Sequence, residues 1–134
     1  MALFTLEIVT PLKVAYKEEI SMVIARTVDG DIGILAKHAP LVTELAVGEM
    51  VIKKEESEQR YFIAGGFLEI SKEKVVILAD KAVKAEDINL EEEKRNREIM
   101  EAKASKLSED REIVLMQKQL QEVLTKIKIG EKLI

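Results

Sequence analysis

The sequence predicts an N-terminal antiparallel β-sandwich followed by a C-terminal antiparallel helical hairpin. Short segments of alternating apolar and polar residues fill the first part of the chain. Turn signals separate them about every ten residues, as is typical of sandwiches and barrels. Beyond residues 80–87 β-branched residues become sparse and helix formers dominate. The 134 residues therefore divide into a predicted β domain at 1–84 and a predicted helical domain at 85–134.

The first strand has a clear period of two. Phe4, Leu6 and Ile8 share one face of residues 3–9, and Pro11 ends the strand because it has no backbone N–H to donate. The same reasoning predicts further extended segments at residues 14–16, 20–25, 41–47, 50–54, 61–64, 67–70 and 75–79.

Three details of these strands carry an expectation about packing. Ile20, Met22 and Ile24 alternate with their neighbours and are expected to share one face. Gly65-Gly66 predicts a sharp corner, since glycine tolerates positive φ. Residues 75–79 are apolar on both faces, so this strand is expected to be covered on both sides.

Residues 29–41 form the most distinctive stretch of the β domain. The stretch holds two of the six glycines, one of the two prolines and the only histidine, His38. Asp29-Gly30 favours a tight turn, and Pro40 pushes the preceding residue toward an extended conformation. We expect a shaped loop that offers an Asp, a Lys and a His to solvent, which suits a docking surface better than a catalytic site.

Capping signals predict the ends of two helices. Asn89 with Glu92 three residues later is a capping box for the first helix. Ser108 is expected to cap the second helix, and Gly130 is expected to end it. The second helix carries an unbroken apolar seam of Ile113, Met116, Leu120, Val123 and Ile127.

The first helix has a much weaker apolar stripe. Residues 91–98 are all polar, so two turns of the helix offer no apolar contact to the seam. Burial of a Leu or Ile contributes about 1.5–3 kcal/mol, and ordering each residue costs a similar amount. The hairpin is therefore expected to be marginal alone and to lean on the β domain, dock on a partner or exchange between arrangements.

Composition excludes several classes of protein. A net charge of -4 and the lack of a basic stripe with aromatics argue against nucleic-acid binding. The chain has no cysteine, so it has no disulfide framework and no thiolate chemistry. The longest apolar run, residues 75–79, is far shorter than the roughly 20 residues that span a bilayer. The N-terminus shows no signal or presequence pattern, and we expect a soluble protein that reaches a membrane only through partners.

The residues that could carry chemistry are isolated. His38 has no Cys or second His for a zinc site and no motif that pairs it with a serine. Asp29 and Asp31 lack the remaining ligands of a calcium loop, and no Gly-Lys-Ser/Thr follows Gly65-Gly66. We expect no catalytic residue, no cofactor and no metal, so the chain is not an enzyme by itself.

The chain resembles the epsilon subunit of the F-type rotary ATP synthase, which is called delta in mitochondria. The resemblance runs over nearly the whole length and depends on the order and spacing of several short motifs. These are Leu6-Glu7-Ile8-Val9-Thr10-Pro11, Asp31-Ile32-Gly33-Ile34-Leu35, His38-Ala39-Pro40-Leu41, Gly48, Gly65-Gly66-Phe67-Leu68-Glu69-Ile70 and Val76-Ile77-Leu78-Ala79-Asp80-Lys81-Ala82.

The resemblance implies a β-sandwich with two C-terminal helices and a role in the central rotor stalk. The β domain would hold the gamma subunit, sit on the ring of c subunits and transmit torque between proton flow and ATP synthesis. Asp31 would face the polar loops of the c-ring, and His38 would lie near the gamma and c-ring contacts. The protein would be peripheral on the cytoplasmic side of the cell membrane, as part of the complex.

The resemblance also implies a regulatory role for the hairpin. In bacterial members it folds against the β domain or extends along gamma, and the extended form inhibits ATP hydrolysis. Basic side chains then approach an acidic segment of the catalytic beta subunit. The candidates in this chain are Arg111, Lys118, Lys126 and Lys128.

An alternative reading is an ATP-sensing module whose hairpin changes conformation when nucleotide binds. Some members bind ATP through Ile/Leu-Asp-x-x-Arg-Ala at the start of the first helix. The matching run is Ile88-Asn89-Leu90-Glu91-Glu92-Glu93, in which Asn replaces Asp and Glu replaces Arg and Ala. Carboxylates there would repel phosphates, so we expect weak ATP binding or none.

Overall fold

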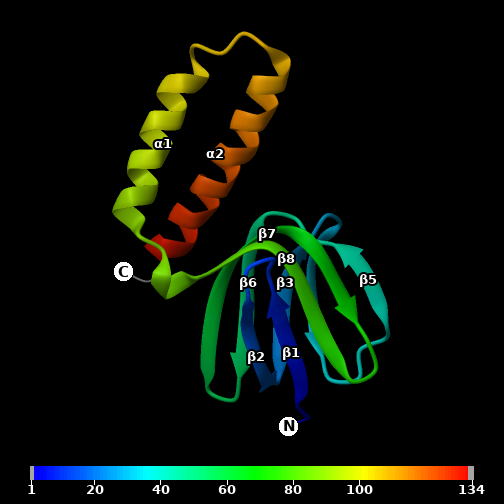
Figure 1. Ribbon diagram of the computed structural model, residues 1–134. Coiled ribbons are helices and arrows are strands. Elements are labelled where there is room, and N and C mark those ends of the chain that lie inside the picture. The colour runs from blue at the N-terminus through cyan, green and yellow to red at the C-terminus, as the bar shows by residue number, and fades with distance from the viewer. Residues whose placement is uncertain (1, 133–134) are drawn as a thin grey trace. The chain divides into compact units, whose positions relative to one another are not determined.

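The computed structural model describes residues 2–132 and divides the chain into two compact units, Met1–Lys84 and Ala85–Ile134. The first unit is a β-sandwich formed by one eight-stranded sheet that curls on itself (Figure 1). Its strands are β1 (Phe4–Val9), β2 (Val14–Ile20), β3 (Met22–Thr27), β4 (Gly30–Leu35), β5 (Leu41–Glu44), β6 (Gly48–Lys54), β7 (Ser57–Ile70) and β8 (Lys74–Lys84).

The sheet follows the order β2-β1-β8-β7-β6-β3-β4, and β5 pairs with β7 outside this path. β1 and β8 run parallel, with Leu6 opposite Val75 and Ile8 opposite Ile77, whereas the other pairings of the described strands are antiparallel. The β-sandwich predicted from the alternation is thus confirmed, with one parallel contact that alternation cannot reveal.

β7 connects the two layers of the sandwich. Its first half, Ser57–Ile63, pairs with β6, and its last four residues, Phe67–Ile70, pair with β5. Gly65 and Gly66, with φ of +69° and +102°, lie between the two halves. The predicted corner is therefore a bend within one continuous strand, and glycine is needed there because side-chain-bearing residues rarely adopt these φ values.

The predicted face for residues 20–25 is wrong. Ile20, Val23 and Ala25 are buried, whereas Met22 and Ile24 are half-buried. The strand breaks at Ser21, whose backbone N–H and hydroxyl both donate to the carbonyl oxygen of Lys53, at 3.0 Å and 2.9 Å. This break shifts the alternation by one residue and so exchanges the two faces.

The stretch 29–41 is also more regular than expected. Gly30–Leu35 is the strand β4, which pairs with β3 in register from Met22↔Leu35 to Thr27↔Gly30. Asp31 therefore lies on a strand and not on a loop. Only the short connection to β5, which contains His38, fits the loop that the sequence predicts.

The core of the sandwich consists of aliphatic side chains from both layers. Those at most 1% exposed include Leu6, Ile8, Ile20, Val23, Ile34, Met50, Ile52, Leu68 and Ile77. Each contributes about 1.5–3 kcal/mol through the hydrophobic effect. Apolar burial therefore stabilises the fold of the β-sandwich unit, which is called the head below.

The second unit is a helical hairpin of α1 (Leu90–Ala104) and α2 (Asp110–Glu131), preceded by the 3-10 turn η1 (Ala85–Asp87). The Asn89 cap is confirmed, because its side-chain oxygen accepts a hydrogen bond of 3.0 Å from the backbone N–H of Glu92. None of the residues of α1 is buried, as the polar run 91–98 predicts. The seam of α2 is half-buried or buried throughout, from Ile113 to Ile127.

Two predicted helix ends are wrong. Glu109, and not Ser108, occupies the N-cap position of α2, and it makes no side-chain capping hydrogen bond. Gly130 lies inside the last turn of α2 rather than beyond it. A β-carbon at Gly130 would lie 3.3 Å from Leu90 Cδ1 and 3.5 Å from Ile88 Cγ2, so the glycine allows close packing at the base of the hairpin.

Candidate docking surface

An exposed apolar row crosses the outer face of the β-sandwich. Val9 on β1 lies opposite Leu78 on β8, Leu78 lies opposite Phe67 on β7, and Phe67 lies opposite Glu44 on β5. Phe67 is 54% exposed and Leu78 is 46% exposed. Because side chains alternate along a strand, the row points outward while Leu68 and Ile77, one residue away, enter the core.

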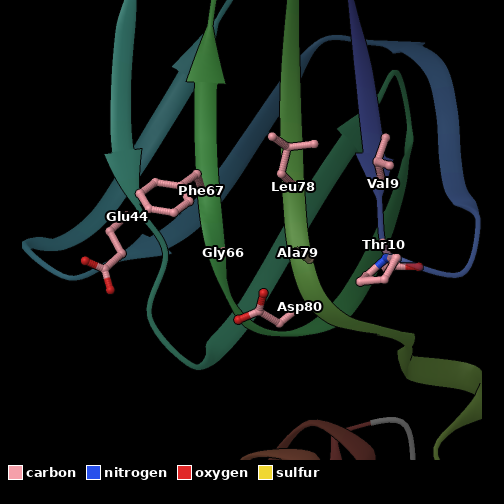
Figure 2. Close-up of a pocket in the computed structure, with 9 residues that line it drawn as sticks. Val9, Thr10, Glu44, Gly66, Phe67, Leu78, Ala79 and Asp80 are labelled. Carbon is pink, nitrogen blue, oxygen red and sulfur yellow. The ribbon is translucent and has the colours of Figure 1, made fainter.

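The row borders a shallow groove of about 480 Å³, which is also lined by Thr10, Pro11, Gly66, Ala79 and Asp80. Figure 2 shows the side chains of Val9, Leu78 and Phe67 along one line across the strands, with the carboxylates of Glu44 and Asp80 to one side. A second row on this face, displaced by two residues, contains Val76 and Val42, and Val42 is 68% exposed.

Glycine shapes the floor of this groove. A β-carbon on Gly66 would lie 1.9 Å from the carbonyl oxygen of Leu78 and 2.9 Å from Ala79 Cα, so β7 can approach β8 this closely only with glycine at that position. An apolar strip on a rigid sheet, bordered by two carboxylates, is suited to binding a macromolecular surface with apolar and basic groups.

Asp31 lies near the start of β4 and forms an ion pair with Arg26. The distance from Arg26 Nε to Asp31 Oδ1 is 2.6 Å, and Arg26 Nη2 lies 3.5 Å from Oδ2. Both side chains are about half exposed, so the pair is accessible to a partner and contributes little to stability.

His38 lies in the connection between β4 and β5 and is half-buried. Its Nδ1 atom lies 2.8 Å from the carbonyl oxygen of Ala39, so one ring nitrogen is engaged with the neighbouring backbone. Leu35 is the fourth residue after Asp31 along β4, which corresponds to a rise of about 13 Å. The structure therefore does not bring Asp31 and His38 together in one site.

The four predicted cations of α2 are in different environments. Arg111 and Lys118 are exposed and seven residues apart, so they share one face of the helix. Lys128 is exposed and lines a shallow groove with Gln117, Gln121 and Leu124. Lys126 is turned into the hairpin, where its Nζ lies 3.7 Å from Glu93 Oε1.

A buried tyrosine lies at one end of the core. The rings of Tyr16 and Tyr61 meet edge to face with centroids 5.9 Å apart. The hydroxyl of Tyr16 has no hydrogen-bond partner among residues 2–132. Burial, together with the negative charge of Glu18, raises the pKa of Tyr16 to about 12. The ion pair of Lys54 with Glu18, at 2.8 Å, lowers the pKa of Glu18.

Within residues 2–132 no group of three or more His, Asp or Glu side chains is placed to hold a metal ion. Neither α1 nor α2, nor any other described helix, combines the length and apolar character needed to cross a bilayer.

Sequence reasoning missed the apolar row, because it expected the strand at residues 75–79, which contains Leu78, to be covered on both faces. The signal that could have found it is the alternation Phe67-Leu68-Glu69-Ile70, which places Phe67 on the same face as Glu69. A phenylalanine that shares a face with a carboxylate on a half-buried strand indicates an exposed aromatic side chain.

Comparison with known proteins first defines the class of the head. Residues 3–85 match the family described as ATP synthase, Delta/Epsilon chain, beta-sandwich domain. The chain is 54% identical over 132 residues to the ATP synthase epsilon chain, sodium ion specific, of Propionigenium modestum, covering 98% of this chain and 96% of that protein. It is 35% identical over 126 residues to the epsilon chain of Desulforamulus reducens, covering 94% and 96% of the two chains.

The chain therefore belongs to the ATP synthase epsilon chain family. Among solved structures, a chain of the Euglena gracilis mitochondrial ATP synthase (OSCP/F1/c-ring, rotational state 1) matches with a TM-score of 0.78 and 25% identity, covering 98% of this chain and 81% of that one. A chain of the Tetrahymena thermophila mitochondrial ATP synthase central stalk/c-ring matches in fold alone, with a TM-score of 0.66 and 13% identity over 95% of this chain and 96% of that one.

Proposed function

We propose that this chain is a non-catalytic subunit of the central stalk of a rotary ATP synthase. Its β-sandwich couples rotation of the c-ring, through gamma, to the catalytic subunits of the enzyme, and its helical hairpin inhibits ATP hydrolysis. The complex would hold it peripherally on the cytoplasmic side of the cell membrane. Membership of the epsilon family supports this role, and the apolar row in which the half-buried Val9 adjoins the exposed Leu78 and Phe67 is the observation that carries the docking step.

The apolar row is the proposed site for gamma. Its residues lie on paired strands, so little backbone conformational entropy is lost when a partner covers them. Covering the exposed half of Leu78 alone is worth about 1 kcal/mol. Asp31, near the start of β4, is proposed to face the c-ring, and His38, in the connection between β4 and β5, is proposed to lie near the gamma and c-ring contacts.

Arg111, Lys118, Lys126 and Lys128 are proposed to approach an acidic segment of the catalytic beta subunit. Arg111 and Lys118 are exposed on one face of α2, whereas the Lys126 side chain is only 23% exposed in the closed hairpin and would gain access when the hairpin opens. This arrangement supports a hairpin with two states, in which the closed state does not inhibit.

The docking step is tested with Leu78→Ser and its matched control Leu3→Ser. The two leucines are similarly exposed, at 46% and 44%, but Leu3 precedes β1 and does not line the groove. Titration of the full chain with purified gamma, followed by calorimetry, should show roughly fivefold to tenfold weaker binding for Leu78→Ser and no change for Leu3→Ser. Equal binding by both variants would overturn the docking role of the row.

The regulatory role is tested by ending the chain after Asp87. The truncated chain keeps the complete β unit, so it should still assemble with gamma and the c-ring. ATP hydrolysis by the assembled complex should increase, because the proposed inhibitory helices are gone. Failure to assemble would show that the helices, and not the sandwich, attach the subunit.

A further inference from the structure

The two helices of the hairpin are joined by different forces along their length. At the base, Ile88 and Leu90 pack on α2 at Gly130, where the absence of a β-carbon allows close approach. Over the next two turns α1 has only polar residues, and two ion pairs reach across to α2. Glu93 Oε1 lies 3.7 Å from Lys126 Nζ, and Lys94 Nζ lies 4.0 Å from Glu131 Oε1.

The two ion pairs differ in burial. Lys94 and Glu131 are 45% and 55% exposed, so water and salt screen their attraction. Glu93 and Lys126 are 13% and 23% exposed, so their charges are screened much less and attract more strongly. Of these two ion pairs, the one between Glu93 and Lys126 therefore contributes more to keeping the helices together.

The burial of Glu93 also makes the closed hairpin depend on Lys126. Glu93 Oε2 is buried and has no hydrogen-bond partner among residues 2–132. A buried carboxylate is tolerated when a cation compensates its charge, and removing that cation leaves a costly unpaired group. Glu93 thus favours closure only while Lys126 stays in the hairpin.

Lys126 is also one of the cations proposed to meet an acidic surface of the beta subunit. In the closed hairpin the Lys126 side chain is 23% exposed and lies against Glu93, so carboxylates of another chain have limited access to its ammonium. An acidic partner, however, can replace Glu93 and so lower the cost of separating the helices.

We propose that Glu93 and Lys126 form an electrostatic latch that keeps the hairpin closed, and that an acidic partner surface releases it by competing for Lys126. This inference rests on the proposed function of the hairpin as an inhibitor of hydrolysis. It adds the residue pair that sets the balance between the closed and open hairpin.

The test uses Glu93→Gln in the full chain, with Glu92→Gln as the matched control. Both changes remove one charge from the first turn of α1 and keep the side-chain size, but Glu92 is exposed. The chain has no cysteine, so spin labels at Glu98→Cys and Gln119→Cys, one on each helix, report the interhelical distance by electron resonance. Far-UV circular dichroism checks that both helices remain formed.

Glu93→Gln should lower the ratio of closed to open hairpin about fivefold, as expected for a partly buried pair, and Glu92→Gln should leave it unchanged. In the assembled complex, Glu93→Gln should strengthen inhibition of ATP hydrolysis. An unchanged distance distribution, or a more closed hairpin because the cost of burying the charge exceeds its attraction to Lys126, would overturn the latch.

The two ideas fail in different ways. If Glu93→Gln opens the hairpin but hydrolysis is unaffected, the latch stands and the inhibitory role of the hairpin is wrong. If hydrolysis responds to truncation after Asp87 but the labels in Glu93→Gln do not separate, the inhibitory role stands and the latch is wrong.

Discussion

Among the described glycines, Gly66 is the one at which an added methyl group would make the closest contact. A β-carbon there would lie 1.9 Å from the carbonyl oxygen of Leu78, whereas an ordinary carbon–oxygen contact is about 3.4 Å. The two strands would have to separate by roughly 1.5 Å, and ladder hydrogen bonds worth about 0.5–1.5 kcal/mol each would weaken or break.

Gly30→Ala is the matched control for this clash. Gly30 has φ of +117° and Gly66 has φ of +102°, so alanine is strained at both positions by about 1–3 kcal/mol. Nothing lies within 4 Å of a β-carbon at Gly30. The difference between the two variants therefore isolates the steric clash from the backbone strain.

We expect Gly30→Ala to lower the free energy of unfolding by about 2 kcal/mol and Gly66→Ala by about 4 kcal/mol or more. Gly65→Ala should fall between them, because its β-carbon meets the flexible side chain of Asp80 rather than backbone. Urea unfolding followed by far-UV circular dichroism measures all three. If Gly66→Ala and Gly30→Ala agree within about 0.5 kcal/mol, β7 and β8 are not packed as closely as the structure shows.

Three smaller perturbations test other parts of the chain. Lys37 has φ of +64°, so Lys37→Gly should raise the urea midpoint by removing about 1 kcal/mol of strain; a lower midpoint would contradict this. The pKa of Tyr16 is about 12 in the fold and 10 when unfolded. The stability it contributes is therefore complete below pH 10, and about 2 kcal/mol is lost as pH rises to 12. Tyr16→Phe should lack this loss between pH 10 and pH 12. If the free energy of unfolding falls with pH equally in both proteins, Tyr16 is not the group responsible. Asn89→Ala removes the cap of the Glu92 N–H and should cost about 1 kcal/mol, visible as faster hydrogen exchange in the first turn of α1; unchanged exchange would mean that the cap is not needed.

Local periodicity was sufficient to predict most strands, because the pleat and the core impose it residue by residue. Phe4–Val9 shows this directly, with Leu6 and Ile8 buried as the alternation predicts. The face of residues 20–25 was wrong for a reason that periodicity cannot detect. The break at Ser21 depends on hydrogen bonds to Lys53, which is 32 residues away in the sequence.

The helix ends show the same limit. Asn89 caps α1 through a contact only three residues away, which a sequence motif can describe. A β-carbon at Gly130 would crowd Ile88 and Leu90, about forty residues earlier, and a local motif cannot reveal such a contact. A glycine near the end of a helix usually marks the helix stop. Here the close packing of α2 on Ile88 and Leu90 explains the glycine better.

The exposed row could not be predicted, because sequence alone does not say what covers an apolar side chain. The run of residues 75–79 correctly predicts a strand, but the predicted cover on both of its faces is wrong. The unit supplies that cover for Val75 and Ile77, while Leu78 stays 46% exposed. An apolar run that the chain itself does not bury is therefore informative about partners rather than about the fold.

The two units depend on different kinds of interaction, and this difference fits the proposed division of labour. The head buries aliphatic side chains that are at most 1% exposed, and such burial is insensitive to nearby charge. None of the residues of α1 is buried, and its first turn reaches α2 through the ion pair of Glu93 with Lys126. A carboxylate of another chain can replace one carboxylate of an ion pair without unfolding the helices. An aliphatic core, by contrast, cannot be opened without unfolding the domain. These properties suit the proposed function, in which the β-sandwich keeps its shape under load while the hairpin responds to an acidic partner.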